Sequence, residues 1–186
     1  MTLGPTLTGE LVALRPLTAD DVTERYVAWL NDPEINRFLE TRHERQTLDS
    51  VSAFVAAVSE SADSWLFAIC RRPDGAHIGN IKLGPTKPRH SLADVSLFIG
   101  ERDAQGQGFG REAIALVARF AFETLALQKL SAGFYADNHA SLRAFDKVGF
   151  RQEGLRRKHY LLDGKPSDII ELGLCADDWR EAPRPA

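Results

Sequence analysis

The sequence predicts an α/β (α+β) protein built on one central mixed sheet. Strand-like hydrophobic runs outnumber helical ones, at about seven against about four. Two pairs of these runs are joined by sequences typical of hairpin turns, around Arg71–Gly75 and Asp163–Pro166. The helical segments interrupt the strands irregularly, whereas a doubly wound nucleotide-binding fold would alternate strand and helix.

The first third of the chain predicts one strand and two helices. Residues 10–14 form the expected strand, and Thr18 is typical of the N-cap of the first helix, because two aspartates and helically spaced apolar residues follow it. Asn31-Asp32-Pro33 ends that helix. After a polar, irregular stretch, Thr47 or Asp49 begins a second amphipathic helix.

Three strands and a long helix are expected next. The strands are Trp65–Cys70, His77–Leu83 and Leu92–Ile99, with a loop at residues 84–88 between the last two. Apolar residues at helical spacing predict a helix over residues 111–127.

The last third predicts a strand, a helix and a hairpin. The strand is Leu130–Ala136. Asn138 is expected to cap the helix that Gly149 closes. Residues 150–162 and 169–175 form the final hairpin.

Bulk properties narrow the class of protein. The 186 residues suit one domain, over residues 1–186. A net charge of −3 favours neither nucleic acid nor an anionic membrane as partner. Cys70 and Cys175 lie far apart, so we expect two thiols in a reducing compartment, with no disulfide and no metal site. Residues 1–10 do not resemble a signal peptide, and no apolar run is long enough to span a bilayer, so we expect a soluble, cytoplasmic protein.

The stretch Gln105-Gly106-Gln107-Gly108-Phe109-Gly110 stands between the third of these strands and the long helix. A glycine turn at a helix start presents free N–H groups and the positive end of the helix dipole, which suits phosphate. No Gly-Lys-Ser/Thr follows, and the spacing is not G-x-G-x-x-G, so two commoner phosphate motifs are excluded. A glycine-rich connection without a ligand remains the alternative.

The pattern Gln-x-x-Gly-x-Gly resembles the acetyl-CoA-binding motif of the GNAT (Gcn5-related N-acetyltransferase) superfamily. Residues 93–99 look like the family's fourth strand, and residues 138–150 resemble its N-x-x-[AS]…K-x-G-F signature. Together these segments extend the resemblance over nearly the whole chain.

Three further segments look like the RimJ/RimL-like branch, which includes acetylators of protein N-termini and amino sugars. They are Arg15-Pro16-Leu17, Trp29-Leu30-Asn31-Asp32 and Ile78-Gly79-Asn80-Ile81. The resemblance implies the GNAT fold, a mostly antiparallel sheet that splays between its fourth and fifth strands.

The resemblance also implies an acetyltransferase that moves the acetyl group of acetyl-CoA directly to a primary amine, without a metal. Backbone donors would polarise the thioester, and the glycine turn would hold the pyrophosphate. The expected cofactor-binding residues are Phe98, Ile99, Gln105, Gly106, Gln107, Gly108, Phe109, Gly110, Arg111, Asn138 and Ser141.

Proton transfer needs a base for the amine and an acid for the departing thiolate. Asp94 occupies the position of a strand-four carboxylate in many members, so it is the candidate base, although it could simply cap a strand edge. Other candidate bases are Glu40, His43, His77 and His159. The position of the family's acidic tyrosine holds Phe145, which has no proton to donate. Ser141 is therefore the candidate donor to the thiolate, with Tyr135 in reserve.

The acceptor amine is expected between the first two helices and the final hairpin. Candidate contacts, which are polar or aromatic, are Phe38, Glu40, Arg42, Asn80, Lys82, His159 and Tyr160. This mixture suits an amino sugar or similar small molecule, or a protein N-terminus. A non-catalytic acyl-CoA-binding regulatory module is the alternative function. A homodimer is common in this branch, but no periodicity here requires one.

Overall fold

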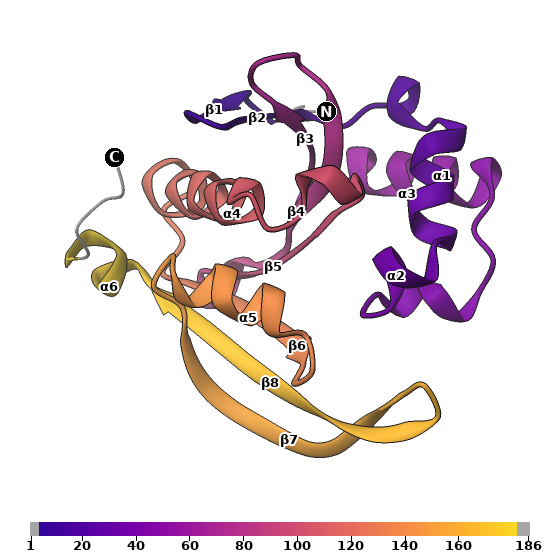
Figure 1. Cartoon of the computed structure of the whole chain (residues 1–186). Helices are drawn as coiled ribbons and strands as arrows, with labels where there is room; N and C mark the ends of the chain where they lie inside the picture. The colour runs from indigo at the N-terminus through magenta and orange to yellow at the C-terminus, as the bar shows by residue number, and fades with distance from the viewer. Residues whose placement is uncertain (1–3, 182–186) are drawn as a thin grey trace.

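The computed structural model describes residues 4–181 and places their strands in one eight-stranded sheet (Figure 1). The strand order is β1-β2-β3-β4-β5-β6-β8-β7. The strands are β1 Leu7–Thr8, β2 Val12–Pro16, β3 Trp65–Arg71, β4 His77–Lys87, β5 Leu92–Ile99, β6 Lys129–Tyr135, β7 Arg151–Leu162 and β8 Lys165–Cys175. All neighbours are antiparallel except β5 and β6.

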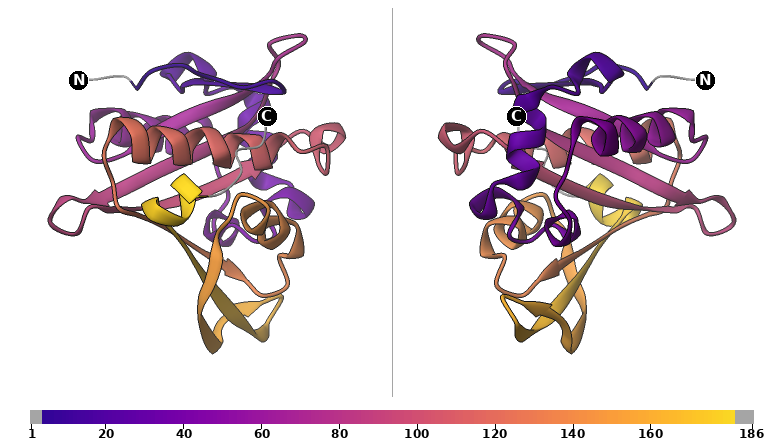
Figure 2. Two further views of the ribbon diagram at one scale, coloured as in Figure 1. Left: turned by 90° about the vertical axis from the view of Figure 1, so that its left-hand side faces the viewer. Right: turned by 90° about the vertical axis from the view of Figure 1, so that its right-hand side faces the viewer.

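Helices lie on both faces of this sheet. They are α1 Glu24–Asn31, α2 Pro33–Asn36, α3 Leu48–Glu60, α4 Phe109–Arg119, α5 His139–Asp146 and α6 Ala176–Glu181. Figure 2 shows α4 in front of one face and α1 to α3 in front of the other, while the β7–β8 hairpin extends away from both. In the described part of the chain, no helix combines the length and the apolar character needed to cross a membrane.

The sheet opens between β5 and β6. These parallel strands are in register only at Leu92, Ala93 and Asp94, opposite Lys129 to Ser131. Beyond Asp94 the two strands diverge, so the edge of β5 over residues 95–99 has no neighbouring strand there. The expected splay between the fourth and fifth main strands is confirmed, since β1 is a short additional strand.

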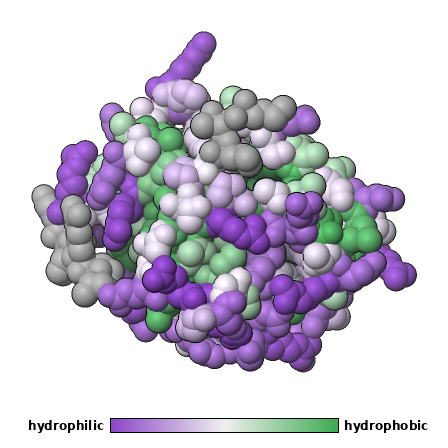
Figure 3. Space-filling model, turned by 90° about the horizontal axis from the view of Figure 1, so that it is seen from above, coloured by the Kyte–Doolittle hydropathy of each residue, from purple (hydrophilic) through white to green (hydrophobic). Residues whose placement is uncertain are grey.

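The hydrophobic core has two main parts, one on each face. Alternation along β5 sends Val95 into the cluster under α4, and sends Phe98 into the cluster under α1 and α3. Seen from above, small hydrophobic areas lie among hydrophilic side chains over the surface (Figure 3), as is usual for a face in contact with water.

The first helix begins later than predicted. Thr18 caps a short 3-10 turn, η1 (Ala19–Asp21), and Thr23 caps α1. The Asp21 carboxylate accepts hydrogen bonds from the Thr18 N–H and from Arg15, and these bonds close the turn. Burial alone would raise the Asp21 pKa, but the bonds from Arg15 and Thr18 outweigh it and lower that pKa to about 2. Thr47 is confirmed as the N-cap of α3.

Two further elements differ from the predictions. The expected helix over residues 111–127 is α4 followed by a π-helical turn, η5 (Phe120–Thr124). The expected loop at residues 84–88 mostly belongs to β4, which continues past an irregularity between Leu83 and Thr86 to pair with Leu92 and Ala93. The short strand β1 and the helices α2 and α6 were not predicted, and β8 begins at Lys165, before the expected start at Ile169.

Candidate active site

A cleft of about 600 Å³ opens where the sheet splays. It is bounded by the end of β5, the glycine turn, the start of α4 and one side of α5. Its lining includes Leu97, Phe98, Ile99, every residue from Gln105 to Arg111, Asn138 and Ser141. We call it the loop cleft. Every residue expected to hold the cofactor therefore lines one continuous cleft.

The glycine turn has the backbone conformation that its sequence suggests. Gly106 and Gly108 adopt φ of 75° and 91°, in the left-handed region that other residues rarely enter. Gly108 is the N-cap of α4 and Gly110 lies in its first turn, against the Leu97 side chain. The free N–H groups of the first turn thus face the cleft with the positive end of the helix dipole.

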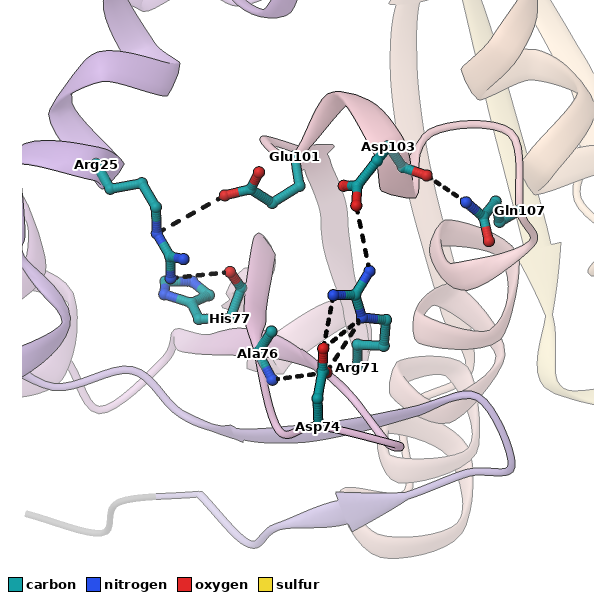
Figure 4. A network of polar contacts seen from close by, with 8 residues as sticks. All are labelled: Arg25, Arg71, Asp74, Ala76, His77, Glu101, Asp103 and Gln107. Carbon is teal, nitrogen blue, oxygen red and sulfur yellow. Dashed lines mark hydrogen bonds and ion pairs between the residues drawn. The ribbon is translucent and has the colours of Figure 1, made fainter.

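Three arginines contact carboxylates in and around the segment that leads into this turn. Arg25 of α1 lies 3.7 Å from Glu101, and Arg102 lies 2.7 Å from Asp32 at the start of α2. Arg71 bridges Asp74 and Asp103, while the Gln107 side chain donates to the Asp103 carbonyl oxygen (Figure 4). Each pair is largely exposed and individually weak, but together they tie the segment to both sides. The Gln105 amide adds a hydrogen bond of 3.2 Å to the Ile99 carbonyl oxygen.

Cations without carboxylate partners line the loop cleft. Arg111 lies at the start of α4, and Arg143 and Lys147 lie one turn apart along α5 and just after it. Among the described residues none of these three forms an ion pair within 4.0 Å, whereas most other arginines near the turn do. Three uncompensated positive charges around a helix N-terminus suit a ligand with several phosphates.

Asn138 caps α5, and its side-chain oxygen accepts a hydrogen bond of 3.2 Å from the Ser141 N–H. Ser141 is also one of the residues that line the loop cleft. Phe145, in the same helix, is fully buried against Phe134 and Phe150. Ser141 is therefore the hydroxyl-bearing residue that α5 presents to the cleft.

A second cavity of about 740 Å³ lies on the other side of β5, beneath α1, α3 and the 3-10 turn η2 (Glu40–His43). We call it the β4–β5 cavity. It shares four lining residues with the loop cleft: Phe38, Leu39, Leu97 and Phe98. The two spaces therefore meet at the diverging edge of β5, where a group held in one can approach a group held in the other.

The floor of the β4–β5 cavity comes from paired positions of two strands. Asn80 is opposite Phe98, and Lys82 is opposite Ser96. Asn80 is buried, and its oxygen lies 2.7 Å from Nε2 of His77. Burial lowers the His77 pKa, which favours a neutral ring that donates to Asn80. The Asn80 amide nitrogen has no hydrogen-bond partner in the described part of the chain.

One wall of this cavity is fixed by a partly buried arginine. Arg42 donates to the Leu39 and Leu161 carbonyl oxygens and, at 2.8 Å, to the Tyr135 hydroxyl. Tyr135 in turn donates to Glu40 at 2.5 Å. Burial and the Glu40 carboxylate raise the Tyr135 pKa. Partial desolvation would raise the Glu40 pKa, but the bonds from Tyr135 and Arg42 outweigh it and lower that pKa. This network joins η2 to β6 and to the β7–β8 hairpin.

The expected acceptor contacts divide into three groups. Phe38, Glu40, Asn80 and Lys82 line the β4–β5 cavity. Arg42 and Tyr135 support its wall from behind. His159 and Tyr160 are exposed on β7 and line neither space, although the Tyr160 ring contacts the Tyr135 ring in a tilted arrangement, with 5.8 Å between centroids.

The candidate bases are similarly divided. Asp94 is the last β5 residue in register with β6, opposite Ser131, and lines neither the cleft nor the cavity. Glu40 and His43 line the β4–β5 cavity. His77 supports its floor through Asn80, and His159 lies on the distant hairpin.

Sequence reasoning missed Arg143 as a cleft residue and assigned Lys147 a structural role. Arg143 and Lys147 are four residues apart and follow the Asn138 cap, so a helix that begins there carries both on one side. This spacing could have predicted them as cleft residues. It also missed the carboxylate of Glu112, which accepts from the N–H groups of Glu10, Leu11 and Val12 and holds the β1–β2 turn over α4.

Comparison with known proteins gives a consistent result. The family model described as Acetyltransferase (GNAT) domain matches residues 12–151. The human alpha/beta-tubulin-N-acetyltransferase 9 is 28% identical over 157 residues, covering 78% of this chain and 75% of that protein. The SPbeta prophage-derived uncharacterized N-acetyltransferase YokL of Bacillus subtilis (strain 168) is 27% identical over 172 residues, covering 92% and 94%.

Among solved structures, the spermidine N-acetyltransferase from Vibrio cholerae in complex with CoA and spermine superposes with a TM-score of 0.83. The match covers 93% of this chain and 100% of that one, at 19% identity, so it shows a shared fold.

Proposed function

Because the chain belongs to the GNAT acetyltransferase family, we propose that it transfers the acetyl group of acetyl-CoA directly to a primary amine. The amine belongs to a small molecule, such as an amino sugar, or to a protein N-terminus. The segments at residues 15–17, 29–32 and 78–81 support a place in the RimJ/RimL-like branch.

The observation that carries this proposal is the meeting of two cavities at one strand edge. The loop cleft and the β4–β5 cavity have separate linings apart from four shared residues around Leu97 and Phe98. Direct transfer requires both reactants to be present together with their reacting atoms in contact. Two spaces that join only at the open edge of β5 provide that arrangement.

The residues of the loop cleft fit acetyl-CoA, which supplies the thioester to be attacked. The N–H groups at the start of α4 would hold the pyrophosphate, and Arg111, Arg143 and Lys147 would offset its charge. The open edge of β5 leaves backbone groups of Phe98 and Ile99 free to bind the pantetheine arm as an added strand would. A donor among them would polarise the thioester carbonyl.

Proton transfer would use groups on both sides of the junction. Ser141 lies in the loop cleft, which supports its hydroxyl as the donor of a hydrogen bond to the leaving sulfur. The presence of Glu40 and His43 in the other cavity supports either as the base ahead of Asp94, which lines neither space.

The test is to incubate the protein with acetyl-CoA and a panel of amines, and to follow free thiol release. The panel holds peptides beginning with Ala or Ser, amino sugars, aminoglycosides and polyamines. Amine-dependent thiol release is the expected result. Tight acetyl-CoA binding without release across the panel would favour the alternative, a non-catalytic acyl-CoA-binding regulatory module. We also propose that the protein is cytoplasmic and forms a homodimer. Cell fractionation tests the location, and light scattering tests the oligomeric state.

A further inference from the structure

We propose that the acceptor is an α-amino acid with an apolar side chain, and that Lys82 selects it by binding its carboxylate. The inference rests on the proposed function and deepens it by naming the acceptor class. It is carried by the composition of the β4–β5 cavity and by the placement of charge within it.

Most of the cavity wall is apolar. The side chains concerned come from α1, α3, β3, β5 and the segment after α2: Tyr26, Leu30, Phe38, Leu39, Val51, Phe54, Leu66, Leu97 and Phe98. Sugars and aminoglycosides carry hydroxyl groups that such a wall would desolvate without hydrogen bonds, at a cost in affinity. An apolar substituent would instead gain from the burial.

A single cation stands on the floor of this cavity. Lys82 is half-buried and lines the cavity, but forms no ion pair within 4.0 Å among the described residues. Lys82 helps to lower the pKa of Asp63 through its charge, but the Asp63 carboxylate already accepts hydrogen bonds from Ser61 and Ser64. Lys82 therefore remains free to pair with an anion that enters the cavity.

The register places this cation close to the junction. Lys82 is opposite Ser96, two residues along the strand from the pair of Asn80 and Phe98, a separation of about 7 Å. An α-amino acid keeps its carboxyl carbon two bonds from its amine nitrogen. An amine at the Phe98 edge would thus leave the carboxylate within reach of the flexible lysine stem.

The same cation disfavours polyamines, whose additional ammonium groups would meet an unpaired like charge. Glu44 on the opposite wall could attract such a ligand, so a polyamine belongs in the test. Glu40 is less available, because Tyr135 and Arg42 already bind its carboxylate.

The experiment measures kcat/KM of thiol release for L-leucine, L-leucinamide, the dipeptide Leu-Gly, glucosamine and spermidine. We expect L-leucine to exceed L-leucinamide, glucosamine and spermidine by about tenfold or more, the scale of one charge-assisted hydrogen bond. The dipeptide, which offers a neutral carbonyl near the amine, should resemble leucinamide. If kcat/KM for the dipeptide equalled that for L-leucine, selection through the free carboxylate would be overturned and a peptide N-terminus would be identified as the acceptor.

The variant Lys82→Met keeps the stem and removes the charge. It should raise the KM for L-leucine about tenfold, leave the KM for leucinamide and acetyl-CoA unchanged, and retain the melting temperature. Lys87→Met is the matched control, because Lys87 lies on the same strand, is exposed and lines neither space. Equal rates with leucine and spermidine, or an unchanged leucine KM in Lys82→Met, would overturn this inference while leaving acetyl transfer intact. Absence of thiol release with every amine would overturn both proposals.

Discussion

The loop cleft and the β4–β5 cavity lie on opposite sides of one strand edge, but they are built differently. The loop cleft is formed largely by backbone: a glycine turn, a helix N-terminus and a strand edge with no neighbour. The β4–β5 cavity is formed by side chains from elements far apart in the chain. Binding in the first therefore depends on local conformation, and binding in the second depends on which side chains the fold brings together.

This difference has a consequence for how each region responds to substitution. A backbone site is disturbed by a change in φ at one residue, and most side-chain replacements leave its donors in place. A side-chain cavity is reshaped by any single replacement in its wall, while the fold remains. The following substitutions test this contrast.

The largest effect is expected from Gly106→Ala. Gly106 and Gly164 share a φ of 75°, and a Cβ at either position would meet no heavy atom within 4 Å. Both alanine variants should therefore lose a similar 1–2 kcal/mol of stability, roughly the left-handed penalty. Only Gly106→Ala should weaken acetyl-CoA binding, by about 30-fold, because it alone displaces donors of the turn. Calorimetry and thermal melts measure both, and equal affinities in the two variants would refute a backbone-built site.

A smaller effect is expected from the cleft cations. Replacing Arg143 and Lys147 together by Gln should raise the KM for acetyl-CoA about tenfold at low salt, with the difference shrinking as ionic strength rises. Arg119→Gln is the control, because Arg119 is exposed at the far end of α4. If the double variant and Arg119→Gln have the same KM for acetyl-CoA, the cleft charges contribute nothing to binding and backbone contacts suffice.

Ser141→Ala should lower kcat about fivefold, corresponding to one neutral hydrogen bond of about 1 kcal/mol to the leaving sulfur. Its KM for acetyl-CoA should remain near that of the parent protein. Steady-state kinetics at saturating substrates make the measurement. Full turnover in this variant would remove Ser141 from the chemistry.

Arg42→Ala tests the side-chain wall. Without its bonds to Leu161 and Tyr135, the turn η2 should loosen and the KM for the acceptor should rise about threefold, with the acetyl-CoA KM unaffected. Arg45→Ala changes an exposed neighbour in the same segment and should have no effect. A shift in the acetyl-CoA KM instead would show that the two regions are not independent.

The smallest effect concerns pH. The Glu40 pKa is lowered in the folded protein from 4.5, so its contribution to stability is complete above pH 4.5 and is lost as pH falls through the lower folded value. The melting temperatures of the parent protein and of Glu40→Gln should therefore converge on acidification below pH 4.5. A difference in melting temperature that stays constant with pH would mean that the carboxylate charge does not stabilise η2.

The same contrast explains what could be predicted from the sequence. Residues 92–99 were predicted as a strand and form β5, because a mainly apolar run that ends at a glycine leaves few alternatives. The glycine turn and the Asn138 cap were also predicted, and Thr47 was one of the two residues expected to begin α3, since each feature depends on residues within one turn of the chain.

Features set by distant contacts were not predicted. Thr18 has the signals of a helix start, but the competing bonds from Arg15 to Asp21 close a short turn and leave the helix to begin at Thr23. The predicted loop at residues 84–88 gains strand structure through pairing with β5. Tyr135 was considered as an acid, whereas Glu40 and Arg42, more than 90 residues away, engage its hydroxyl.

The four residues common to both spaces also suggest a way to inhibit the enzyme. A compound that joins CoA to an acceptor through a short acetyl linker on sulfur would occupy both spaces at once. The second half would then bind at a high effective concentration, without a further loss of translational freedom. Phe38 and Leu39, which line both spaces, would contact the linker region and be shielded from solvent by it. Such a bisubstrate compound should bind far more tightly than CoA or the amine alone.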